Sequence, residues 1–404
     1  MSKLDDLIAE LCPNGVNYKV LNTICHIYDG THTTPKYTES GIRFASVENI
    51  QNPYDSNKYI SVEEFEKYKI KPQTGDVLMT RIGSIGVCYV VESDEPLAYY
   101  VSLALLRPNP RVLNSRYLKY AIESKDGKRE LRKKTLVNAV PIKVNKDDIG
   151  KIKIPVPPVE VQYEIVRVLD NFMELTAELT AELTARKVQY EYYSDAIMKF
   201  PGAECYSLGD LCDIVDYRGK TPKKSDEGIF LVTAKNIRQG YIDYEKSKEY
   251  IPFETYKDVM RRGLPQIGDV LITTEAPCGY VAQVDREDIA LAQRVIKYRP
   301  KDREFLDATF LKYTLLGKEF QNKLEKAATG GTVKGIKGST LHTMTIPVPD
   351  IDMQKRTVDV LKQFDKLCYS ATDGLPAEIE TRQKQYEYYR DLLLSFKEEV
   401  EATV

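Results

Sequence analysis

The chain contains two copies of one sequence plan, and this repeat constrains its fold more than any other feature. Five short motifs recur in the same order, with 187 to 196 residues between the two members of a pair. Two such copies predict two similar domains with an internal pseudo-two-fold repeat, which suits a target with two halves. The paired motifs are Thr34-Pro35-Lys36 and Thr221-Pro222-Lys223, Gly75-Asp76-Val77-Leu78 and Gly268-Asp269-Val270-Leu271, Arg107-Pro108 and Arg299-Pro300, Ile154-Pro155-Val156-Pro157 and Ile346-Pro347-Val348-Pro349, and Gln189-Tyr190-Glu191-Tyr192-Tyr193 and Gln385-Tyr386-Glu387-Tyr388-Tyr389.

Each copy begins with a region of mixed strands and helices. Short apolar runs that follow turn residues predict the strands. Because neither copy shows the regular strand–helix alternation of a doubly wound sheet, the predicted fold class is α+β. In the first copy we expect strands at 42–47, 77–80, 87–91, 103–107 and 152–156, with helices at 115–123 and 128–136. In the second copy we expect strands at 229–233, 270–273, 280–284, 292–298 and 343–348, with helices at 305–316 and 318–328.

A long helix follows each Ile-Pro-Val-Pro motif. The first, 159–200, contains no glycine or proline, and its apolar residues are spaced as a heptad seam: Val161, Ile165, Val168, Phe172, Leu175 and Leu179. The second, 351–396, is interrupted by Gly374 and Pro376, so we expect a break there. The first helix also carries a repeated Thr-Ala-Glu-Leu unit at 176–183. We assign spacing or partner docking to apolar and aromatic residues of these helices: Leu175, Leu179, Leu183, Tyr190, Tyr193, Tyr386 and Tyr389.

The repeat also predicts how the ends of the chain are used. Cys12-Pro13 aligns with Phe200-Pro201, so the N-terminal helix resembles the end of the central helix. The repeat is therefore cyclic, and we expect the N- and C-terminal segments to meet. The predicted parts are an N-terminal helix at 1–14, a first mixed domain at 15–157, a central helix at 158–200, a second mixed domain at 201–349 and C-terminal helices at 350–404.

Composition and missing motifs exclude several classes of protein. The net charge of −2 argues against a uniformly basic surface, and no run of residues is apolar enough to span a membrane. Seven cysteines without a CxxC pair favour a reducing cytosol and give no metal signature. The three histidines lack metal-ligand spacing, and Gly330–Gly335 is followed by Ile336 where a phosphate-binding loop needs lysine. No catalytic group and no metal site is therefore predicted.

Basic residues of the mixed domains are the candidates for DNA contact. On a helix, Lys125, Lys128, Arg129 and Arg132 share one face, which would neutralise phosphates. The alternatives are a solvated helix surface here, a flexible loop at 329–339, and ordinary surface charge for the isolated residues. The full candidate set is Lys36, Arg43, Arg81, Lys128, Arg129, Arg132, Lys133, Arg218, Lys220, Lys223, Lys224, Lys235, Arg238, Arg261, Arg262, Lys334 and Lys337.

Taken together, the two mixed domains, the long helices, the Thr-Ala-Glu-Leu repeat and the Gln-Tyr-Glu-Tyr-Tyr segments resemble the specificity subunit of type I restriction–modification systems. The resemblance covers the whole chain. It implies two target-recognition domains separated by two long helices packed as an antiparallel coiled coil. It also implies a subunit without catalytic activity that binds double-stranded DNA at a split recognition sequence in the cytoplasm. Two methyltransferase subunits would dock on it and carry S-adenosylmethionine, and restriction subunits would bring ATP- and Mg-dependent cleavage.

Two other functions stay open at this point. The chain could be a two-domain protein-interaction scaffold that does not contact nucleic acid. Steeply salt-dependent binding of duplex DNA would distinguish the specificity subunit from that scaffold, because phosphate contacts release counterions. A catalytic enzyme would require a nucleophile or metal cluster that the sequence does not show. The bases that each domain would read do not follow from the sequence.

Overall fold

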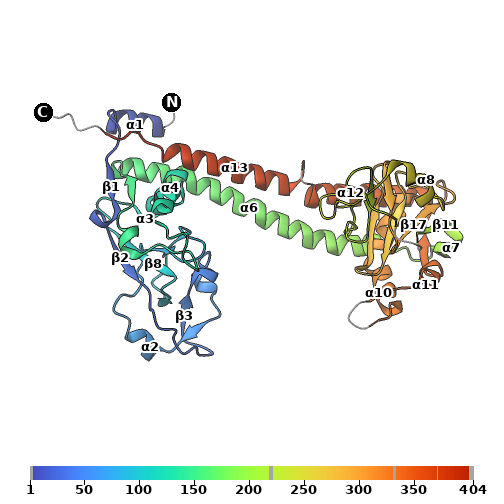
Figure 1. The fold of residues 1–404 in the computed structure, drawn as a ribbon, viewed down its shortest axis with the longest axis horizontal. Helices are drawn as coiled ribbons and strands as arrows, with labels where there is room; N and C mark the ends of the chain where they lie inside the picture. The colour runs from blue at the N-terminus through green and yellow to red at the C-terminus, as the bar shows by residue number, and fades with distance from the viewer. Residues whose placement is uncertain (1–2, 218–221, 331–333, 371, 400–404) are drawn as a thin grey trace. The chain divides into compact units, whose positions relative to one another are not determined.

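The computed structural model describes residues 3–217, 222–330, 334–370 and 372–399, shown in Figure 1. The chain divides into two compact units. Unit 1 comprises Met1–Thr180 and Glu378–Val404, and unit 2 comprises Ala181–Ala377. The two α+β domains expected from the repeat are therefore confirmed, while the two-fold relation between them stays a prediction.

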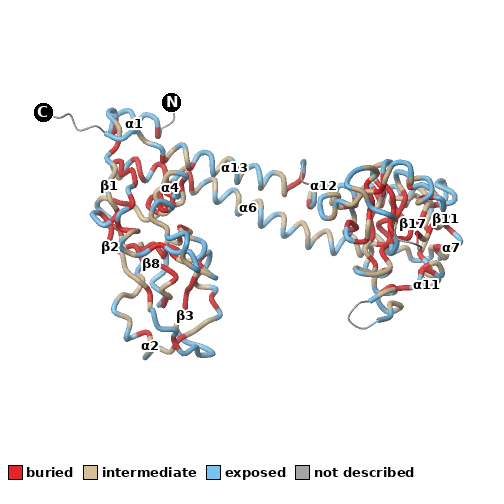
Figure 2. The backbone as a smooth tube through the Cα atoms, in the orientation of Figure 1, coloured by how far each residue is buried: buried red, intermediate tan, exposed pale blue. Residues whose placement is uncertain are grey.

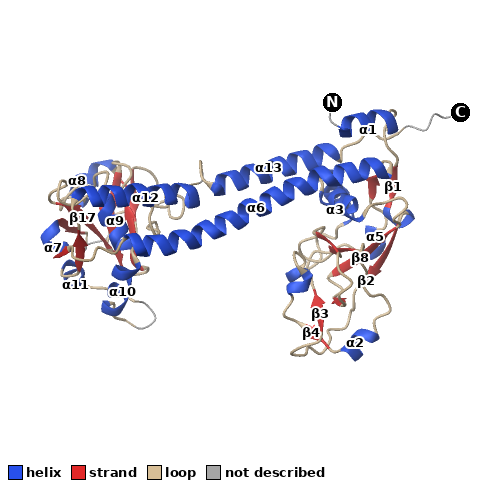
Figure 3. Ribbon diagram, turned by 180° about the vertical axis from the view of Figure 1, so that it is seen from behind, coloured by secondary structure: helices blue, strands red, loops and turns tan. Residues whose placement is uncertain are grey.

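Unit 1 is built from three small sheets and the helices that cover them (Figure 3). A four-stranded antiparallel sheet has the order β2-β8-β5-β6, a three-stranded sheet has the order β4-β3-β7, and β1 pairs with β9. The strands are β1 (Tyr18–Val20), β2 (Cys25–Asp29), β3 (Ile42–Ala45), β4 (Tyr59–Ile60), β5 (Val77–Thr80), β6 (Cys88–Val90), β7 (Leu97–Tyr99), β8 (Leu103–Pro108) and β9 (Lys153–Pro155). The helices are α1 (Lys3–Leu11), α2 (Val62–Glu66), α3 (Ser115–Glu123), α4 (Lys125–Lys134) and α5 (Lys146–Ile149).

Unit 2 repeats this plan with the same connections. Its four-stranded sheet has the order β11-β17-β14-β15, its three-stranded sheet has the order β13-β12-β16, and β10 pairs with β18. The strands are β10 (Glu204–Ser207), β11 (Cys212–Asp216), β12 (Ile229–Val232), β13 (Tyr250–Ile251), β14 (Val270–Thr274), β15 (Cys278–Gln283), β16 (Ile289–Leu291), β17 (Val295–Pro300) and β18 (Thr345–Val348). The helices are α7 (Leu208–Leu211), α8 (Tyr256–Val259), α9 (Ala308–Leu316), α10 (Lys318–Ala327), α11 (Gly338–His342) and α12 (Ile351–Tyr369).

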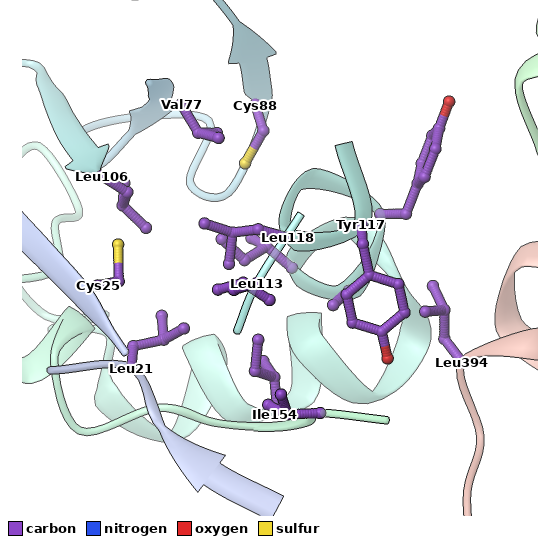
Figure 4. Close-up of a cluster of buried hydrophobic side chains, with 14 of the residues drawn as sticks. Leu21, Cys25, Val77, Cys88, Leu106, Leu113, Tyr117, Leu118, Ile154 and Leu394 are labelled. Carbon is purple, nitrogen blue, oxygen red and sulfur yellow. The ribbon is translucent and has the colours of Figure 1, made fainter. Parts of the chain in front are cut away.

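The central strands are buried on both faces, which explains their continuous apolar sequences. All four residues of β5 are buried, and its Val77 pairs with Leu106 of β8. Helix α3 covers one face of this sheet, where Leu113, Tyr117 and Leu118 meet strand residues and Ile154 (Figure 4). Burial of such side chains contributes roughly 25 cal/mol per Å² of apolar surface, so this cluster stabilises unit 1. Figure 2 shows the same concentration of buried residues on the strands of unit 2.

The Gly-Asp-Val-Leu and Arg-Pro motifs form one buried ion pair in each unit. In unit 1, Arg107 donates two hydrogen bonds to the Asp76 carboxylate, at 2.8 and 2.7 Å. In unit 2, Arg299 does the same to Asp269, at 2.6 and 2.8 Å. The two aspartates are 2% and 0% exposed. These repeated motifs therefore hold two strands of each central sheet together, because a buried carboxylate needs a hydrogen-bonded partner.

Two long helices contain residues of both units. Helix α6 (Val159–Ile197) is continuous, whereas the second long segment breaks between α12 and α13 (Leu375–Leu393). The predicted break at Gly374 and Pro376 is confirmed. In unit 1 the Phe172 ring of α6 stacks on Tyr389 of α13, with 5.3 Å between ring centroids.

The predicted heptad seam is wrong at one position. Leu175 is 47% exposed, whereas Thr176 and Leu179 are partly buried. After Phe172 the half-buried positions up to 190 are 176, 179, 183, 186, 187, 189 and 190. The seam thus steps four residues from Phe172 to Thr176 and three from Thr176 to Leu179, where three and then four were expected, so threonine takes the place that apolarity had assigned to leucine. The Thr176 hydroxyl donates to the Phe172 carbonyl at 2.8 Å, which satisfies this polar group within the helix.

The two ends of the chain meet in unit 1, as the cyclic repeat predicts. The backbone N–H of Val16 donates to the Lys397 carbonyl at 2.8 Å, and that of Glu399 donates to Val16 at 3.1 Å. The Tyr18 hydroxyl donates to the Phe396 carbonyl at 2.9 Å. Phe396 corresponds in the repeat to Phe200, which follows shortly after the end of α6. The C-terminal segment thus completes unit 1 in the way that the end of α6 completes unit 2.

Candidate nucleic-acid interface

Helix α4 has one face built for packing. The Ser124 hydroxyl caps its first turn by accepting a hydrogen bond from the Gly127 backbone N–H at 3.1 Å. Leu131 is buried in the core of unit 1. A Cβ at Gly127 would lie 2.0 Å from the Ala121 carbonyl oxygen, so only glycine allows α4 to follow α3 this closely. These contacts fix which face of α4 is turned to solvent.

The opposite face of α4 is a surface of exposed cations, as the helical spacing predicts. Arg129 forms an ion pair with Asp126 at 3.0 Å, and Lys133 forms one with Glu130 at 2.5 Å. Lys128 and Arg132 are exposed and form no ion pair with any residue that the structure describes. Since surface pairs contribute little stability, all four side chains are available to phosphates.

An exposed loop continues from α4 toward the tip of the central sheet. The backbone of 136–144 bonds to the turn after β5: Gly83 N–H donates to the Ile142 carbonyl at 3.0 Å, and Val144 N–H donates to that of Arg81 at 2.9 Å. Val137 and Val140 of this loop are exposed. These exposed apolar side chains lie beside the basic helix in sequence. We call α4 with the loop 135–144 the basic edge of unit 1.

Two arginine candidates of unit 1 have structural partners. Arg81 is buried and forms an ion pair with Asp29, so it holds the turn after β5 against β2. Arg43 lies 3.5 Å from Glu95 and over the ring of Tyr59. Sequence reasoning did not foresee the Arg81 pair, because the partner lies 52 residues away in the chain. Lys36, in contrast, is exposed in the loop between β2 and β3.

Unit 2 uses a different set of residues at the corresponding edge. Both glutamates of its helix α10 are paired: Glu319 with Lys323 at 2.7 Å, and Glu325 with Lys334, which follows the helix, at 2.8 Å. Beside it, the turn after β14, Thr329 and the residues 335–337 line a pocket of about 480 Å³. Arg294 lines this pocket with Lys337, and its guanidinium lies 3.4 Å from Glu275.

Arg294 was missed by sequence reasoning. It has a positive φ of 72°, a rare conformation for a residue with a side chain, and it is exposed directly before β17. The sequence does contain a feature that could have identified Arg294. Two polar residues, Gln293 and Arg294, interrupt the apolar run 289–296.

The other candidates of unit 2 are scattered over its surface. Lys223, Lys235 and Arg261 are exposed, and no ion pair joins them to the described part of the chain. Lys224 pairs with Glu249 at 2.8 Å, and Arg238 lies 3.6 Å from Asp243. Arg262 donates to the Asp216 carbonyl at 2.7 Å. Arg218 and Lys220 lie outside the described residues.

The helix residues assigned to spacing or docking lie mostly in helix–helix contacts. Tyr190 packs on Phe364 of α12 at 5.6 Å between centroids, and Tyr193 stacks on the same ring at 6.5 Å. Tyr386 contacts Tyr120 of α3 at 6.3 Å. Leu179 and Leu183 are partly buried on α6. These tyrosines therefore take part in packing between helices, and their assigned role in spacing or partner docking stays a prediction.

Several titratable groups of the two units have shifted pKa values. Burial raises the pKa of the Cys25 and Cys212 thiols to about 12, which disfavours the reactive thiolate. Hydrogen bonds from Arg167, and then from Lys3, lower the pKa of the Glu164 carboxyl to about 2. Within the described ranges, no group of three His, Cys, Asp or Glu residues is placed to hold a metal ion.

Comparison with known protein families identifies the family of this chain. The model of the type I restriction modification DNA specificity domain matches residues 13–186 and 202–381, one match for each copy. The chain belongs to this specificity-domain family. The resemblance inferred from the motifs is confirmed, and the two matches follow the internal repeat.

Curated relatives agree with the family assignment. A type I restriction enzyme specificity subunit from Escherichia coli is 36% identical over 262 residues, which cover 61% of this chain and 63% of the relative. A putative specificity subunit from Haemophilus influenzae is 31% identical over 271 residues, covering 63% of this chain and 66% of the relative. The matched regions thus span slightly less than two thirds of each relative.

Solved structures share the fold over nearly the whole chain. A chain from a study of complex assembly and conformational transition of the type I restriction–modification system aligns with a TM-score of 0.63 and 17% identity, covering 95% of this chain and 98% of that one. The HsdS subunit of Thermoanaerobacter tengcongensis aligns with a TM-score of 0.51 and 18% identity, covering 95% and 97%. Among the described residues, no helix of this specificity-family chain is long and apolar enough to cross a membrane.

Proposed function

We propose that this chain is the non-catalytic DNA sequence-recognition subunit of a type I restriction–modification complex. The observation that carries the proposal is the double match to the specificity domain, one match in each structural unit. Each unit has its own sheets, core and polar edge, so each can bind one half of a split site in duplex DNA. The proposed location, the cytoplasm, follows from this substrate.

Partners supply the chemistry in this proposal. Two methyltransferase subunits carry S-adenosylmethionine, and restriction subunits use ATP and Mg. The net charge of −2 supports a shared grip on DNA, since a chain without overall positive charge gains affinity when partners add phosphate contacts. The alternative function is a scaffold that does not contact nucleic acid. The exposed cations of α4 favour DNA binding over this alternative.

The direct test is a map of methylated bases in the host genome. Deleting the gene for this chain should remove methylation at one split motif, and restoring the gene should return it. Methylation of DNA by the purified chain alone would refute the non-catalytic role. Binding of the assembled complex to duplex DNA with an affinity independent of salt would favour the scaffold.

We also propose that the Thr-Ala-Glu-Leu tract sets the gap between the half-sites. The tract is helical throughout, and the Thr180 hydroxyl bonds to the Thr176 carbonyl at 2.8 Å. One more unit adds about 6 Å of helix, which corresponds to roughly one to two base pairs. Inserting Thr-Ala-Glu-Leu after Leu183 should widen the gap by that amount and leave the half-sites unchanged. An unchanged gap would contradict this role.

A further inference from the structure

Unit 2 contains a pocket that unit 1 fills with one of its own arginines. The pocket has a volume of about 890 Å³ and lies among the end of α6, the ends of α9 and α12, and the loop 239–241. Four tyrosines line it, together with the carboxylate of Asp365. The tyrosines are Tyr190, Tyr241, Tyr313 and Tyr369.

The corresponding place in unit 1 holds Arg390. In the repeat, Arg390 follows Gln-Tyr-Glu-Tyr-Tyr just as Ser194 does in unit 2. Arg390 is only 8% exposed, and its guanidinium lies over the Tyr386 ring at 5.5 Å from the centroid. Tyr386 is the repeat partner of Tyr190. Unit 2 thus keeps the aromatic face but has a serine in place of the arginine that covers it.

The carboxylate at this place comes from a different repeat position in each unit. In unit 1 the Tyr120 hydroxyl donates to Asp170 at 2.5 Å, and Asp170 is also paired with Arg116 at 2.5 Å. In unit 2 the matching Tyr313 hydroxyl donates to Asp365 at 2.5 Å, and Asp365 is the repeat partner of Met173. Burial, followed by the charge of Asp365, raises the pKa of the Tyr190 hydroxyl. The carboxylate therefore lies against both tyrosines.

Two further differences enlarge the pocket walls. The segment between the first two strands of the three-stranded sheet is 17 residues long in unit 2 (233–249) and 13 residues long in unit 1 (46–58). The longer segment supplies Gln239–Tyr241, which line the pocket. Tyr369 stands where the repeat has Ala177 in unit 1, and its ring lies 6.1 Å from that of Tyr190.

Neighbouring cations leave the Asp365 charge only partly balanced. Lys312 lies 3.9 Å from its carboxylate, at the limit of an ion pair, and burial lowers the pKa of that lysine. Lys366 also lines the pocket but pairs with Asp373 at 3.0 Å. Aromatic faces with a carboxylate suit a guanidinium, which stacks on rings and donates several hydrogen bonds in one plane.

We propose that this pocket of unit 2 accepts an arginine side chain of a partner protein, in the place that Arg390 occupies in unit 1. The inference rests on the proposed function, because the partner is a methyltransferase subunit of the complex. In unit 1, Arg390 already fills the equivalent place, so a partner's arginine cannot bind there. The two units therefore dock their partner subunits with different contacts, even though they share one fold.

The first test uses the full chain and a small probe. N-acetyl-arginine methylamide should shift the ¹³C-methyl signal of Met198, which lines the pocket, and leave that of Met173 in unit 1 unchanged. The corresponding lysine compound should bind about tenfold more weakly or worse. Asp365→Asn and Ser194→Arg should each abolish the Met198 shift. An equal response to lysine, or a shift that survives Ser194→Arg, would overturn the proposal.

The second test measures assembly with the methyltransferase subunits. Ser194→Arg should weaken assembly by about tenfold or more, since it fills the pocket as Arg390 does in unit 1. Unit 1 shows that this fold accommodates the arginine. Ala196→Arg, an exposed position on the same helix, is the matched control and should assemble normally.

The outcomes of the assembly test separate the two proposals. Unchanged assembly of Ser194→Arg would overturn the docking pocket while the recognition function stands. If the arginine probe binds and assembly is nevertheless unchanged, the pocket serves a small cation and not a partner protein, which also overturns it. Failure of the unaltered chain to assemble with methyltransferase subunits would overturn both proposals.

Discussion

Helices α4 and α10 occupy the same place in the two copies but have different surfaces. Six of the ten residues of α4 are Lys or Arg and two are acidic, whereas α10 has three lysines and two glutamates. Both helices keep one buried leucine, Leu131 in α4 and Leu324 in α10. The comparison teaches that packing is preserved between the copies while the charge presented to a ligand is free to change.

The buried ion pairs test what the two units share, and here we expect the largest effects. Asp76→Asn and Asp269→Asn should each destabilise their own unit by about 3–5 kcal/mol, because each removes the charge of a buried carboxylate and leaves a half-buried arginine without its partner. The effect should be larger for Asp269, since the buried Lys297 also lies 3.7 Å from it. Hydrogen exchange should report the loss on β5 and β8 in one variant and on β14 and β17 in the other.

Equal destabilisation of both units by either variant would break the comparison, because it would mean that the two units do not fold independently. The isosteric Asp94→Asn change, on an exposed loop, provides a control that should leave exchange unaltered.

The basic edge of unit 1 tests what differs between the units. Replacing Lys128 and Arg132 with Gln in the assembled complex should weaken DNA binding by roughly 10- to 100-fold at low salt. The slope of log affinity against log salt should also become shallower by about 1.8, since two phosphate contacts are lost. Replacing Lys323 and Lys326 on α10 with Gln is the matched control, with little expected effect. If both pairs of substitutions have the same effect, the charge difference between the helices has no role in binding.

The pH dependence of stability tests a difference between helix α6 and its counterpart in the repeat, α12. The folded-state pKa of Glu164 is held near 2, below its value of about 4.3 in an unfolded chain, so its contribution to stability is present above pH 4.3 and is lost as the pH falls toward 2. Glu164→Gln should therefore destabilise unit 1 by about 1–2 kcal/mol at pH 7, and the difference from the unaltered chain should shrink below pH 4.

Thermal unfolding from pH 7 to pH 2.5 would measure this effect. The repeat partner of Glu164 is the exposed Arg356, and Arg356→Gln should show no such pH dependence. A constant difference between Glu164→Gln and the unaltered chain at all pH values would exclude the proposed role of Arg167 and Lys3.

Much of the fold follows from the sequence because the decisive patterns are local. Helix α3 was expected at the residues it occupies, and the strands β5, β12 and β14 were placed to within a residue. Strands β2 and β11 were missed, because Cys25-His26-Ile27-Tyr28-Asp29 mixes polar and apolar residues and pairs only through contacts with β8. The shift of the seam from Leu175 to Thr176 depends on the partner helix, which periodicity alone does not include.

The candidate site was less predictable because it depends on long-range neighbours. The spacing of α4 identified its cationic face, but Arg81 proved to be a buried partner of Asp29. The arginine pocket could be recognised only by comparing the three-dimensional structures of the two copies. The difference between Ser194 and Arg390 is visible in the repeat, yet its meaning depends on Asp365 and on the loop 239–241, which the chain brings there from separate regions.

The central claim is that two units with one shared scaffold each read their own half of the target. The most direct measurement is to replace residues 15–157 with the matching segment of another specificity subunit and to map methylated sites in cells that carry the partner subunits. The account predicts that one half of the recognised motif changes and that the other half and the gap stay the same. A simultaneous change in both halves would contradict it.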